Sequence, residues 1–436
     1  MFNLTRLIYS LVFYAALPFI FLRLWIKGRA LPMYRWRYQE RLGFYQNKNL
    51  DRQDQKQQNI ASGKGIDIWV HAVSLGEVIA ITPLIECLLA DKYSILVTTM
   101  TPTGSARVTQ QFSSRVEHCY IPYDIPSAVK RFYQHFAPRI ALIVETELWP
   151  NLLFHAQKKG IELILCNARL SNKSCQEYRK LRWFFRPLLQ KFSGIYSQSD
   201  ADASRFIALG ADLSCVHVFG NIKFDMPVNT VEMGPYLAIK KLWKNRLIII
   251  VASTHEDEEL QILNVWCQLQ AQIPEVLLLI APRHPERFDK IYQLALDKGF
   301  KTGLRSKVEN LAQEKHEVII LDCLGELLGF YAISDYSFVG GSLVPRGGHN
   351  VLEPIAMHVP VLIGPHYFNF EYICQTLLSN QAIIEVQSAQ ELVNSIVSLE
   401  KNPSSKTALC QKSSKTLEAN KGALQKYRLL VQKSLA

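Results

Sequence analysis

Short apolar runs alternate with longer segments of helical periodicity along most of this 436-residue chain. The alternation begins with a strand-like run at 68–73 and a helical stretch at 78–90, and it continues to an apolar run at 216–219. It resumes with a run at 247–252 and a helical stretch at 256–272. Strands that alternate with helices form parallel sheets with crossover helices. The pattern therefore predicts an α/β chain with two doubly wound, Rossmann-like domains.

Residues 226–245 separate the two series. This stretch contains Pro227 and Pro235, which interrupt both kinds of periodicity. We therefore expect a linker at 226–245 between an N-terminal domain at 31–225 and a C-terminal domain at 246–436. Paired domains of this kind face a cleft and bind ligands at the carboxyl ends of their strands. Polar residues at those strand ends are the candidate site residues.

The N-terminal segment, residues 1–30, holds an uncharged apolar run at 7–22 of nearly bilayer-crossing length. Arg23, Lys27 and Arg29 follow this run, where a signal peptide would have a small-residue cleavage site. These residues favour an uncleaved membrane anchor, with the rest of the chain on the cytoplasmic side by the positive-inside rule. A helix that lies in the membrane interface is the alternative.

The chain carries a formal net charge of +11, and much of the excess lies in its first 48 residues. A uniformly basic surface suggests nucleic acid, whereas a basic cluster beside an apolar run suggests a membrane surface or an anionic lipid substrate. We therefore expect no nucleic-acid partner. The nine cysteines are single, without a C-x-x-C pair, and predict a reducing compartment with neither disulfides nor a zinc site.

Acidic residues follow two predicted strands of the N-terminal domain. Glu77 ends the sequence HAVSLGE at 71–77, and Glu147 lies in ETELWP at 145–150. Carboxylates at one edge of a sheet suit general-base chemistry. Because S-x-x-E is also a common helix start, a capping box formed by Ser74 and Glu77 is the structural alternative.

Basic residues follow other predicted strands. Arg169 lies in NARLS and Lys223 in GNIKFD, and together with the carboxylates they predict a site for an anionic substrate with one general base. In the C-terminal domain, His255, Arg283 and His284 also end strands. Arginine and histidine at such positions suit phosphate contact. A single histidine there is equally well explained by a structural hydrogen bond.

A glycine-rich stretch at 336–365 joins a strand-like apolar run at 336–339, a loop, a helical pattern from Asn350 and a second apolar run. We expect the backbone N–H groups of the glycines and of the helix start at Asn350 to bind an anion, and Glu353 can accept hydrogen bonds from sugar hydroxyls. The stretch predicts a nucleotide or nucleotide-sugar site, with turn geometry as the alternative explanation of its glycines. The chain contains neither a P-loop nor a nucleophile elbow, and no motif requires a metal.

In these motifs and in their order, the chain closely resembles the 3-deoxy-D-manno-octulosonic acid (Kdo) transferases of lipopolysaccharide assembly. The resemblance includes the N-terminal anchor and extends over nearly the whole chain. It implies a GT-B fold and inverting transfer of Kdo from CMP-Kdo to the lipid A precursor lipid IVA. It also implies a position at the cell inner membrane, with neither a cofactor nor an obligatory protein partner. The shared motifs are HAVSLGE, ETELWPN, NARLS, SQS, GNIKFD, ASTHEDEE, APRHPERF and GGSLVPRGGHNVLEP.

By the same resemblance, Glu77 is the expected proton acceptor, and Glu147 and Lys223 are expected to stabilise the transition state. A helix N-terminus lowers a carboxyl pKa, so a base at Glu77 should be partly desolvated. A nucleotide-sugar epimerase of the same architecture and a non-catalytic, membrane-tethered sugar-binding protein are the alternatives. The residues expected to line the CMP pocket are Arg283, His284, Leu324, Gly325, Glu326, Asn350, Val351, Leu352 and Glu353.

Overall fold

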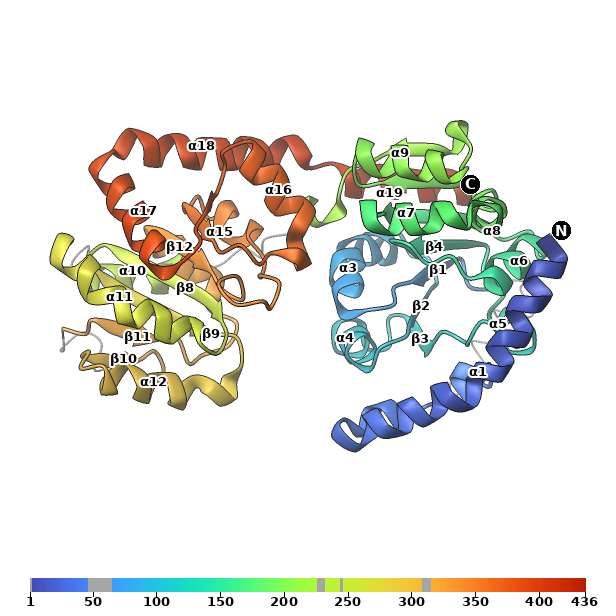
Figure 1. Cartoon of the computed structure of the whole chain (residues 1–436), viewed down its shortest axis with the longest axis horizontal. Coiled ribbons are helices and arrows are strands. Elements are labelled where there is room, and N and C mark those ends of the chain that lie inside the picture. Colours follow the sequence, from blue (N-terminus) through green and yellow to red (C-terminus); the bar gives the residue numbers. More distant parts are fainter. Residues whose placement is uncertain (1, 46–64, 226–231, 244–245, 308–314) are drawn as a thin grey trace. The chain divides into compact units, whose positions relative to one another are not determined.

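Two compact units make up the chain: Met1–Met226 with Lys421–Ala436, and Pro227–Asn420. Each is built on a seven-stranded parallel sheet with helices on both faces (Figure 1). The two doubly wound domains predicted from the sequence are therefore confirmed. The computed structural model describes residues 2–45, 65–225, 232–243, 246–307 and 315–436.

The first unit, unit 1, contains seven strands. They are β1 (Ile68–His71), β2 (Ile95–Thr99), β3 (Glu117–Tyr120), β4 (Ile140–Val144), β5 (Glu162–Ala168), β6 (Gly194–Ser197) and β7 (Val216–Val218). Their order in the sheet is β3-β2-β1-β4-β5-β6-β7, and Trp69 of β1 lies opposite Leu96 of β2 and Ala141 of β4. The direction of winding reverses between β1 and β4, and doubly wound sheets bind ligands at such a switch point.

Helices cover both faces of this sheet because successive side chains of each strand point to opposite sides. Trp69 packs into the core under one set of helices, whereas Val70 packs under the other. The set over Val70 is α3 (Leu75–Ala90), α4 (Pro102–Phe112) and α19 (Ala423–Leu435). The set over Trp69 is α5 (Pro126–Phe136), α6 (Pro150–Lys158), α7 (Asn172–Lys180), α8 (Arg182–Leu189) and α9 (Asp200–Leu209).

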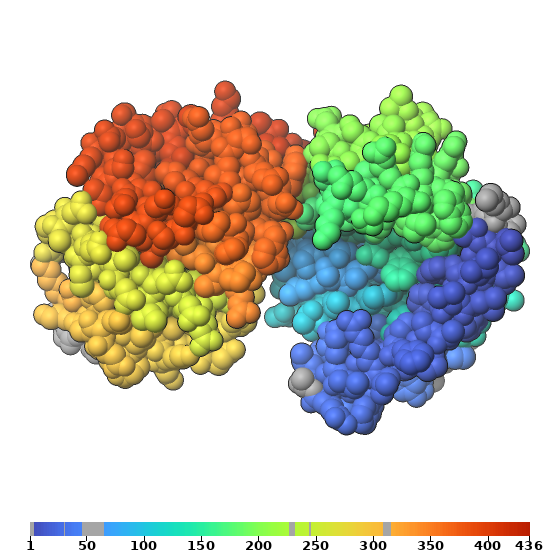
Figure 2. Space-filling view, viewed as in Figure 1, coloured from blue at the N-terminus to red at the C-terminus, as the bar shows by residue number. Residues whose placement is uncertain are grey.

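The first helix, α1 (Phe2–Ala30), lies along the outside of unit 1 and contacts α6 and α8 (Figures 1 and 2). Its segment Leu4–Arg29 is long and apolar enough to cross a membrane, which is consistent with the predicted anchor. Two 3₁₀ turns, Pro32–Arg35 and Glu40–Leu42, follow it, and the first packs back against α1. In the space-filling view α1 is the dark blue ridge on unit 1, and its outer surface is uncovered on the visible face (Figure 2).

The second unit, unit 2, also contains seven strands. They are β8 (Ile248–Thr254), β9 (Leu277–Pro282), β10 (Thr302–Leu304), β11 (Val318–Ile320), β12 (Tyr336–Val339), β13 (Val361–Ile363) and β14 (Ile384–Glu385). The sheet order is β10-β11-β9-β8-β12-β13-β14, so the switch point lies between β8 and β12. Buried aliphatic side chains fill both faces, as expected of parallel strands: Ile249 of β8 packs into one core and its neighbour Ile250 into the other.

Helices again cover both faces. One core includes α10 (Met233–Leu242) and α14 (Leu327–Ile333). The opposite core includes α11 (Glu258–Gln272), α12 (Phe288–Asp297) and α17 (Ala389–Lys401), with Trp266 buried among them. The remaining helices of unit 2 are α15 (Leu352–Ala356), α16 (Glu371–Ser379) and α18 (Pro403–Asn420).

The predicted linker at 226–245 is wrong for its centre, which forms α10 and belongs to unit 2. Tyr236 and Trp243 both pack against Phe330 of α14. A Cβ at Gly329 would collide with the Tyr236 ring, so this close approach requires glycine. The two ends of the predicted linker, 226–231 and 244–245, lie outside the described residues.

The predicted C-terminal domain is wrong at its end, because residues 421–436 pack on unit 1. In α19, the buried Tyr427 hydroxyl accepts the backbone N–H of Asn167 over 2.7 Å. At the start of the same helix, the Asp225 carboxylate accepts the N–H of Gly422, also over 2.7 Å. The chain therefore returns to the first sheet after it has completed the second.

Candidate active site

Glu77 lies in the first turn of α3, directly after β1. The Ser74 hydroxyl accepts the backbone N–H of Glu77 over 3.4 Å and donates to its Oε1 over 2.7 Å. Glu77 Oε2 accepts the N–H of Val73 over 2.8 Å. The capping box considered as an alternative is therefore present. It also fixes the position of the carboxylate at the sheet edge, as a general base would need.

Glu77 is only 9% exposed. Burial raises the pKa of Glu77, the hydrogen bond from Ser74 opposes this shift, and the nearby charge of Glu145 adds to it. The partial desolvation expected of a base at this position is thus built into the fold. The catalytic role of Glu77 stays a prediction.

Glu147 follows β4, the neighbour of β1 in the sheet. The Trp149 indole Nε1–H donates to Glu147 Oε2 over 2.6 Å. Burial raises the pKa of Glu147 to about 7, although the Trp149 hydrogen bond opposes this, and the charges of Glu77 and Glu145 raise it further. Close to pH 7, this carboxyl is divided between its two protonation states.

Lys223 lies in a 3₁₀ turn after β7, in the same cluster. Burial lowers the pKa of Lys223, and the charge of Arg169 adds to this shift. The charges of Glu145 and Glu77 oppose it. The fold therefore brings the three predicted catalytic residues, Glu77, Glu147 and Lys223, into one electrostatic cluster with Glu145 and Arg169. Such a mixture of carboxylates and cations can bind an anionic group and accept a proton from it.

Two residues of this edge have left-handed backbone conformations that side chains rarely adopt: Glu145 (φ 61°) and Asn167 (φ 52°). Strain of this kind is held in place by surrounding contacts and is often found at functional sites. Asn167 Oδ1 accepts the N–H of Ile222, and Tyr427 of α19 holds the Asn167 N–H. Tyr427 could not be predicted from the sequence, since nothing in the last helix indicates which sheet it covers.

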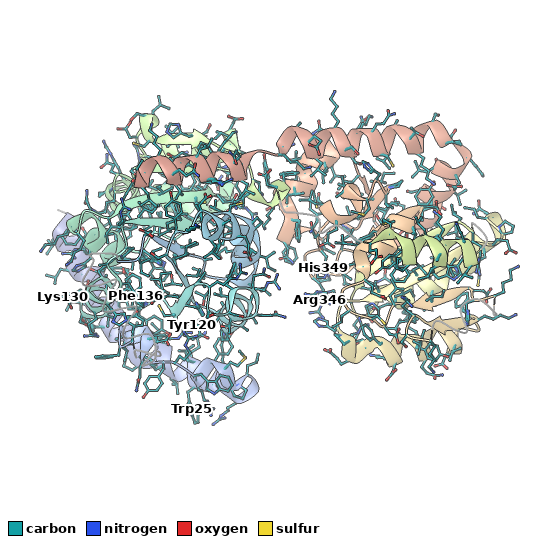
Figure 3. The ribbon with its side chains drawn as sticks, turned by 180° about the vertical axis from the view of Figure 1, so that it is seen from behind. Trp25, Tyr120, Lys130, Phe136, Arg346 and His349 are labelled. Carbon is teal, nitrogen blue, oxygen red and sulfur yellow. The ribbon has the colours of Figure 1, made fainter. Side chains whose placement is uncertain are left out.

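Unit 2 gathers three histidines at one sheet edge, from loops after the adjacent strands β9, β8 and β12. His255 Nε2 lies 2.9 Å from His349 Nε2, and the two rings are parallel, with an interplanar angle of 5°. The His284 ring meets His255 edge-on at 5.4 Å between centroids. Figure 3 labels His349 beside Arg346. In the described part of the chain, no group of three or more His, Cys, Asp or Glu residues is placed to hold a metal ion.

Arg283 and Arg346 place positive charge beside this histidine cluster. Burial lowers the pKa of His349 to about 4, and the nearby charges of Arg283, His255 and His284 add to the shift. Burial likewise lowers the pKa of His255, and His284 and Arg346 contribute. Both rings are therefore neutral near pH 7. A bound anion would offset the repulsion among these groups and make protonation easier.

Four of the nine predicted substrate residues line one cavity of about 150 Å³ next to this cluster. They are Arg283, Leu324, Gly325 and Glu326. Apolar side chains, including Phe288 and Phe330, complete the lining. A small apolar pocket with a few polar groups is typical of a site for a planar base or a sugar. The predicted residues outside this lining are His284, Asn350, Val351, Leu352 and Glu353.

Glu353 interacts electrostatically with Arg283, which lines the cavity. Burial raises the pKa of Glu353, and the nearby charge of Arg283 opposes this shift. The Asn350 side-chain amide donates to Glu353 Oε1 over 3.1 Å, and Asn350 Oδ1 accepts the N–H of Leu352. The helix starts at Leu352 rather than at Asn350 and is only five residues long. Asn350 is therefore the residue that satisfies the helix start and orients Glu353.

The glycine-rich loop differs from its prediction. The Glu258 carboxylate accepts the N–H groups of Gly341, Ser342 and Leu343 over 2.6, 2.9 and 3.0 Å. The prediction that the loop glycines offer free N–H groups to a phosphate is therefore wrong at Gly341. A fully buried side chain of the protein itself fills this anion site.

Several solved structures share this architecture. One is a glycosyltransferase from Rickettsia africae, at 14% identity and a TM-score of 0.56, which covers 85% of this chain and 99% of its own. Another is a UDP-GlcNAc 2-epimerase from Neisseria meningitidis bound to UDP-GlcNAc, at 13% identity and a TM-score of 0.53 with the same coverage. These likenesses confirm the GT-B-like fold and, at such identity, say nothing more about the epimerase alternative.

Sequence relatives are more specific. A family model for 3-deoxy-D-manno-octulosonic-acid transferase (kdotransferase) matches residues 36–226. The 3-deoxy-D-manno-octulosonic acid transferase of Bordetella pertussis is 32% identical over 367 residues, 82% of this chain and 84% of the relative. That of Haemophilus influenzae is 37% identical over 425 residues, 97% of this chain and 96% of the relative. With this identity over almost its whole length, the chain belongs to the Kdo transferase family of glycosyltransferases.

Proposed function

We propose that this glycosyltransferase moves Kdo from CMP-Kdo to lipid IVA with inversion, at the cytoplasmic face of the cell inner membrane. The observation that carries the proposal is the pair of carboxyls, Glu77 and Glu147, whose pKa values are both raised at the switch point of unit 1. Lys223 and Arg169 add positive charge beside them. An acceptor that is anionic and reacts through a sugar hydroxyl needs this combination of carboxylates and cations.

The reaction requires a base because a sugar hydroxyl has a pKa far above 7. Glu77 accepts the hydroxyl proton while the acceptor oxygen bonds to the anomeric carbon of Kdo. The bond from that carbon to the phosphate oxygen breaks, and CMP leaves with the electron pair. The ionised form of Glu147 stabilises positive charge that develops on the sugar, and Lys223 balances the charge of the carboxylates.

The donor belongs to unit 2 in this proposal. Arg283 and the histidine cluster stabilise the negative charge on the departing phosphate. The 150 Å³ cavity receives the cytosine base, and Glu353 accepts hydrogen bonds from the ribose hydroxyls. Because CMP carries one phosphate rather than two, these side chains supply the stabilisation without a metal cofactor.

Purified full-length protein mixed with CMP-Kdo and lipid IVA tests the proposal, with the lipid weighed by mass spectrometry. The lipid should gain the mass of at least one Kdo residue while CMP is released. Glu77→Gln should lose transfer and keep CMP binding. A lipid of unchanged mass, from protein that binds CMP, would refute the proposal.

A further inference from the structure

The helix α1 has two chemically different faces. Its inward face carries Arg6, Tyr9, Ser10 and Phe13 against unit 1, with Ser10 only 4% exposed. Its outward face is apolar, and the side chains there are 48 to 74% exposed. The outward residues are Leu4, Leu7, Ile8, Leu11, Val12, Phe19, Leu22, Trp25 and Ile26.

Polar groups hold the N-terminal half of α1 on unit 1. The buried amide of Asn151 donates to Ser10 Oγ over 3.0 Å and lies within 3.4 Å of the Arg6 guanidinium. The Tyr9 hydroxyl hydrogen-bonds to the Asp124 carboxylate, which is 2% exposed. Buried polar groups need such partners, and lipid hydrocarbon offers none. These side chains therefore favour packing of this face of α1 on unit 1 over contact with lipid.

Aromatic contacts extend the docking toward the C-terminal end of the helix. Phe13 lies 6.2 Å from Tyr123 and 6.5 Å from Trp149, between ring centroids. Phe21 meets the same Tyr123 at 5.8 Å. From Arg6 to Phe21, the docked part is about 22 Å long at 1.5 Å per residue.

A docked helix of this kind cannot cross a bilayer. Crossing takes about 20 residues and puts the two helix ends on opposite sides of roughly 30 Å of hydrocarbon. Here Arg6 and Phe21 touch the same globular unit. Burial lowers the pKa of His155 of α6, and the charges of Arg6, Lys158 and Lys130 add to the shift, so these cations surround the N-terminal end. Charged side chains of this number are costly in hydrocarbon.

The outward face is bordered by basic and aromatic residues. Arg29 and Arg35 lie over the Trp25 ring at 4.6 and 4.9 Å, and Trp36 is 59% exposed nearby along the chain. Figure 3 labels Trp25 near the C-terminal end of α1, and Lys130 on α5. An apolar stripe with tryptophan and a cationic border is the pattern of a helix that lies in the surface of an anionic membrane.

We propose that α1 lies in the plane of the membrane interface. Its inward face stays docked on unit 1, and its outward face enters the headgroup and upper acyl region of anionic lipids. Both ends of the helix then remain on the same side of the membrane as unit 1. The proposal thus favours the interfacial helix, which the sequence left open as the alternative to a membrane-crossing anchor. It does not depend on which donor or acceptor the enzyme uses.

Topology is the first test. A cysteine-bearing tag is fused before residue 1, and intact spheroplasts are treated with a membrane-impermeant thiol reagent. The proposal expects labelling of the tag only after the membrane is opened, as for the exposed native Cys267. Labelling of the tag in intact spheroplasts, with Cys267 still protected, would show that α1 crosses and would overturn the proposal.

Depth in the bilayer is the second test. Single nitroxide labels at Leu4→Cys, Val12→Cys and Phe19→Cys are compared in vesicles of anionic lipid. An in-plane helix places all three at a similar shallow depth of about 5–10 Å. A spanning helix places Val12→Cys far deeper than the others. Protein that stays off the vesicles and forms a dimer would assign this face to a second copy and would also refute the proposal.

Charge variants test the choice of lipid. Each basic residue near an anionic surface strengthens binding about fivefold, so replacing Arg23, Lys27 and Arg29 by glutamine should weaken vesicle binding roughly a hundredfold. Arg115→Gln is the matched control, because Arg115 follows α4 on the opposite face of the sheet. Equal binding by the triple variant and the control would contradict the proposal.

Discussion

The carboxylate of Glu258, at the start of α11, accepts the backbone N–H of Gly341 over 2.6 Å, and so joins the ends of β8 and β12. The same carboxylate accepts the N–H of His255 over 2.9 Å. Gly341 has φ of 69°, and a Cβ there would approach the rings of both His255 and His349. Glu258 therefore sets the spacing in which the two histidines meet.

Replacement of Glu258 by alanine should destabilise the protein by more than about 3 kcal/mol. Four N–H groups would lose their acceptor, two of them buried and two part-buried, and each unsatisfied buried group costs about 1–3 kcal/mol. Denaturant unfolding followed by fluorescence measures the loss. The control is Glu256→Ala, two residues before Glu258, which removes an exposed ion pair with Lys290 and should leave the free energy of unfolding nearly unchanged. Similar losses in both variants would refute this role for Glu258.

Glu77→Gln should lower kcat by about 10²- to 10⁴-fold, the usual contribution of a general base. The amide keeps the shape of the side chain, so the capping interactions with Ser74 weaken but are not abolished, and the melting temperature should change little. Rapid-quench measurement of CMP release gives kcat. The control is Glu86→Gln, which changes a carboxylate on the same helix as Glu77 that forms an exposed ion pair with Arg115. This variant should leave kcat unchanged.

Local patterns were enough to place most strands, because their apolar periodicity does not depend on the rest of the chain. The run at 336–339 is predicted and observed as the same strand, β12. The helix α10 was missed because Pro235 was taken as a breaker. Proline is tolerated in the first turn of a helix, and Pro235 is the third residue of α10. The destination of α19 depends on the distant contact between Tyr427 and Asn167, which no local pattern contains.

In the candidate site, too, local patterns were enough for some residues, whereas others depend on distant contacts. Glu77, Glu147 and Lys223 could be grouped from the sequence because parallel strands end at one sheet edge. The buried position of Glu258 could not, since HEDEE leads into the predicted helical stretch at 256–272 and nothing local shows which of its carboxylates is buried. Glu259 in the same motif is also buried, where it pairs with Arg287 at 2.8 Å. Which carboxylates of a cluster face solvent is decided by tertiary packing.

Arg283→Lys should raise the KM for the donor by about ten- to a hundredfold. A guanidinium can hold a phosphate through two parallel hydrogen bonds, whereas an ammonium acts as a point charge. Initial rates at varied donor concentration measure the change, and kcat for the saturated enzyme should fall less than kcat/KM. Lys298→Arg, on an exposed helix end of the same unit, should leave both unchanged.

Incubation with EDTA should leave the transfer rate unchanged. The proposal uses Arg283 and the histidine cluster, rather than a metal ion, to stabilise the departing phosphate. Rates are compared after dialysis against chelator and after addition of Mg²⁺ or Mn²⁺. Loss of transfer with the chelator and its recovery with one metal would contradict this part of the proposal.

Transfer should become faster as the pH rises through about 7, because the ionised form of Glu147 is the form that stabilises positive charge on the sugar. Burial raises the pKa of Glu147 to about 7 from its usual 4.5. The stability of the fold has the opposite trend. A raised carboxyl pKa contributes stability that is complete below about 4.5 and is lost as the pH rises through about 7. The enzyme therefore gains activity over the same range in which Glu147 ceases to stabilise the fold.

Two variants separate this titration from others in the cluster. Glu147→Gln is neutral at every pH, so it should show low kcat/KM throughout and no rise near pH 7. Trp149→Phe removes the N–H that favours the ionised carboxylate, and a hydrogen bond of about 1 kcal/mol corresponds to roughly 0.7 pH units. In that variant the rise in kcat/KM should move to higher pH by about this amount. A profile that moves to lower pH, or a rise that persists in Glu147→Gln, would assign the titration to another group.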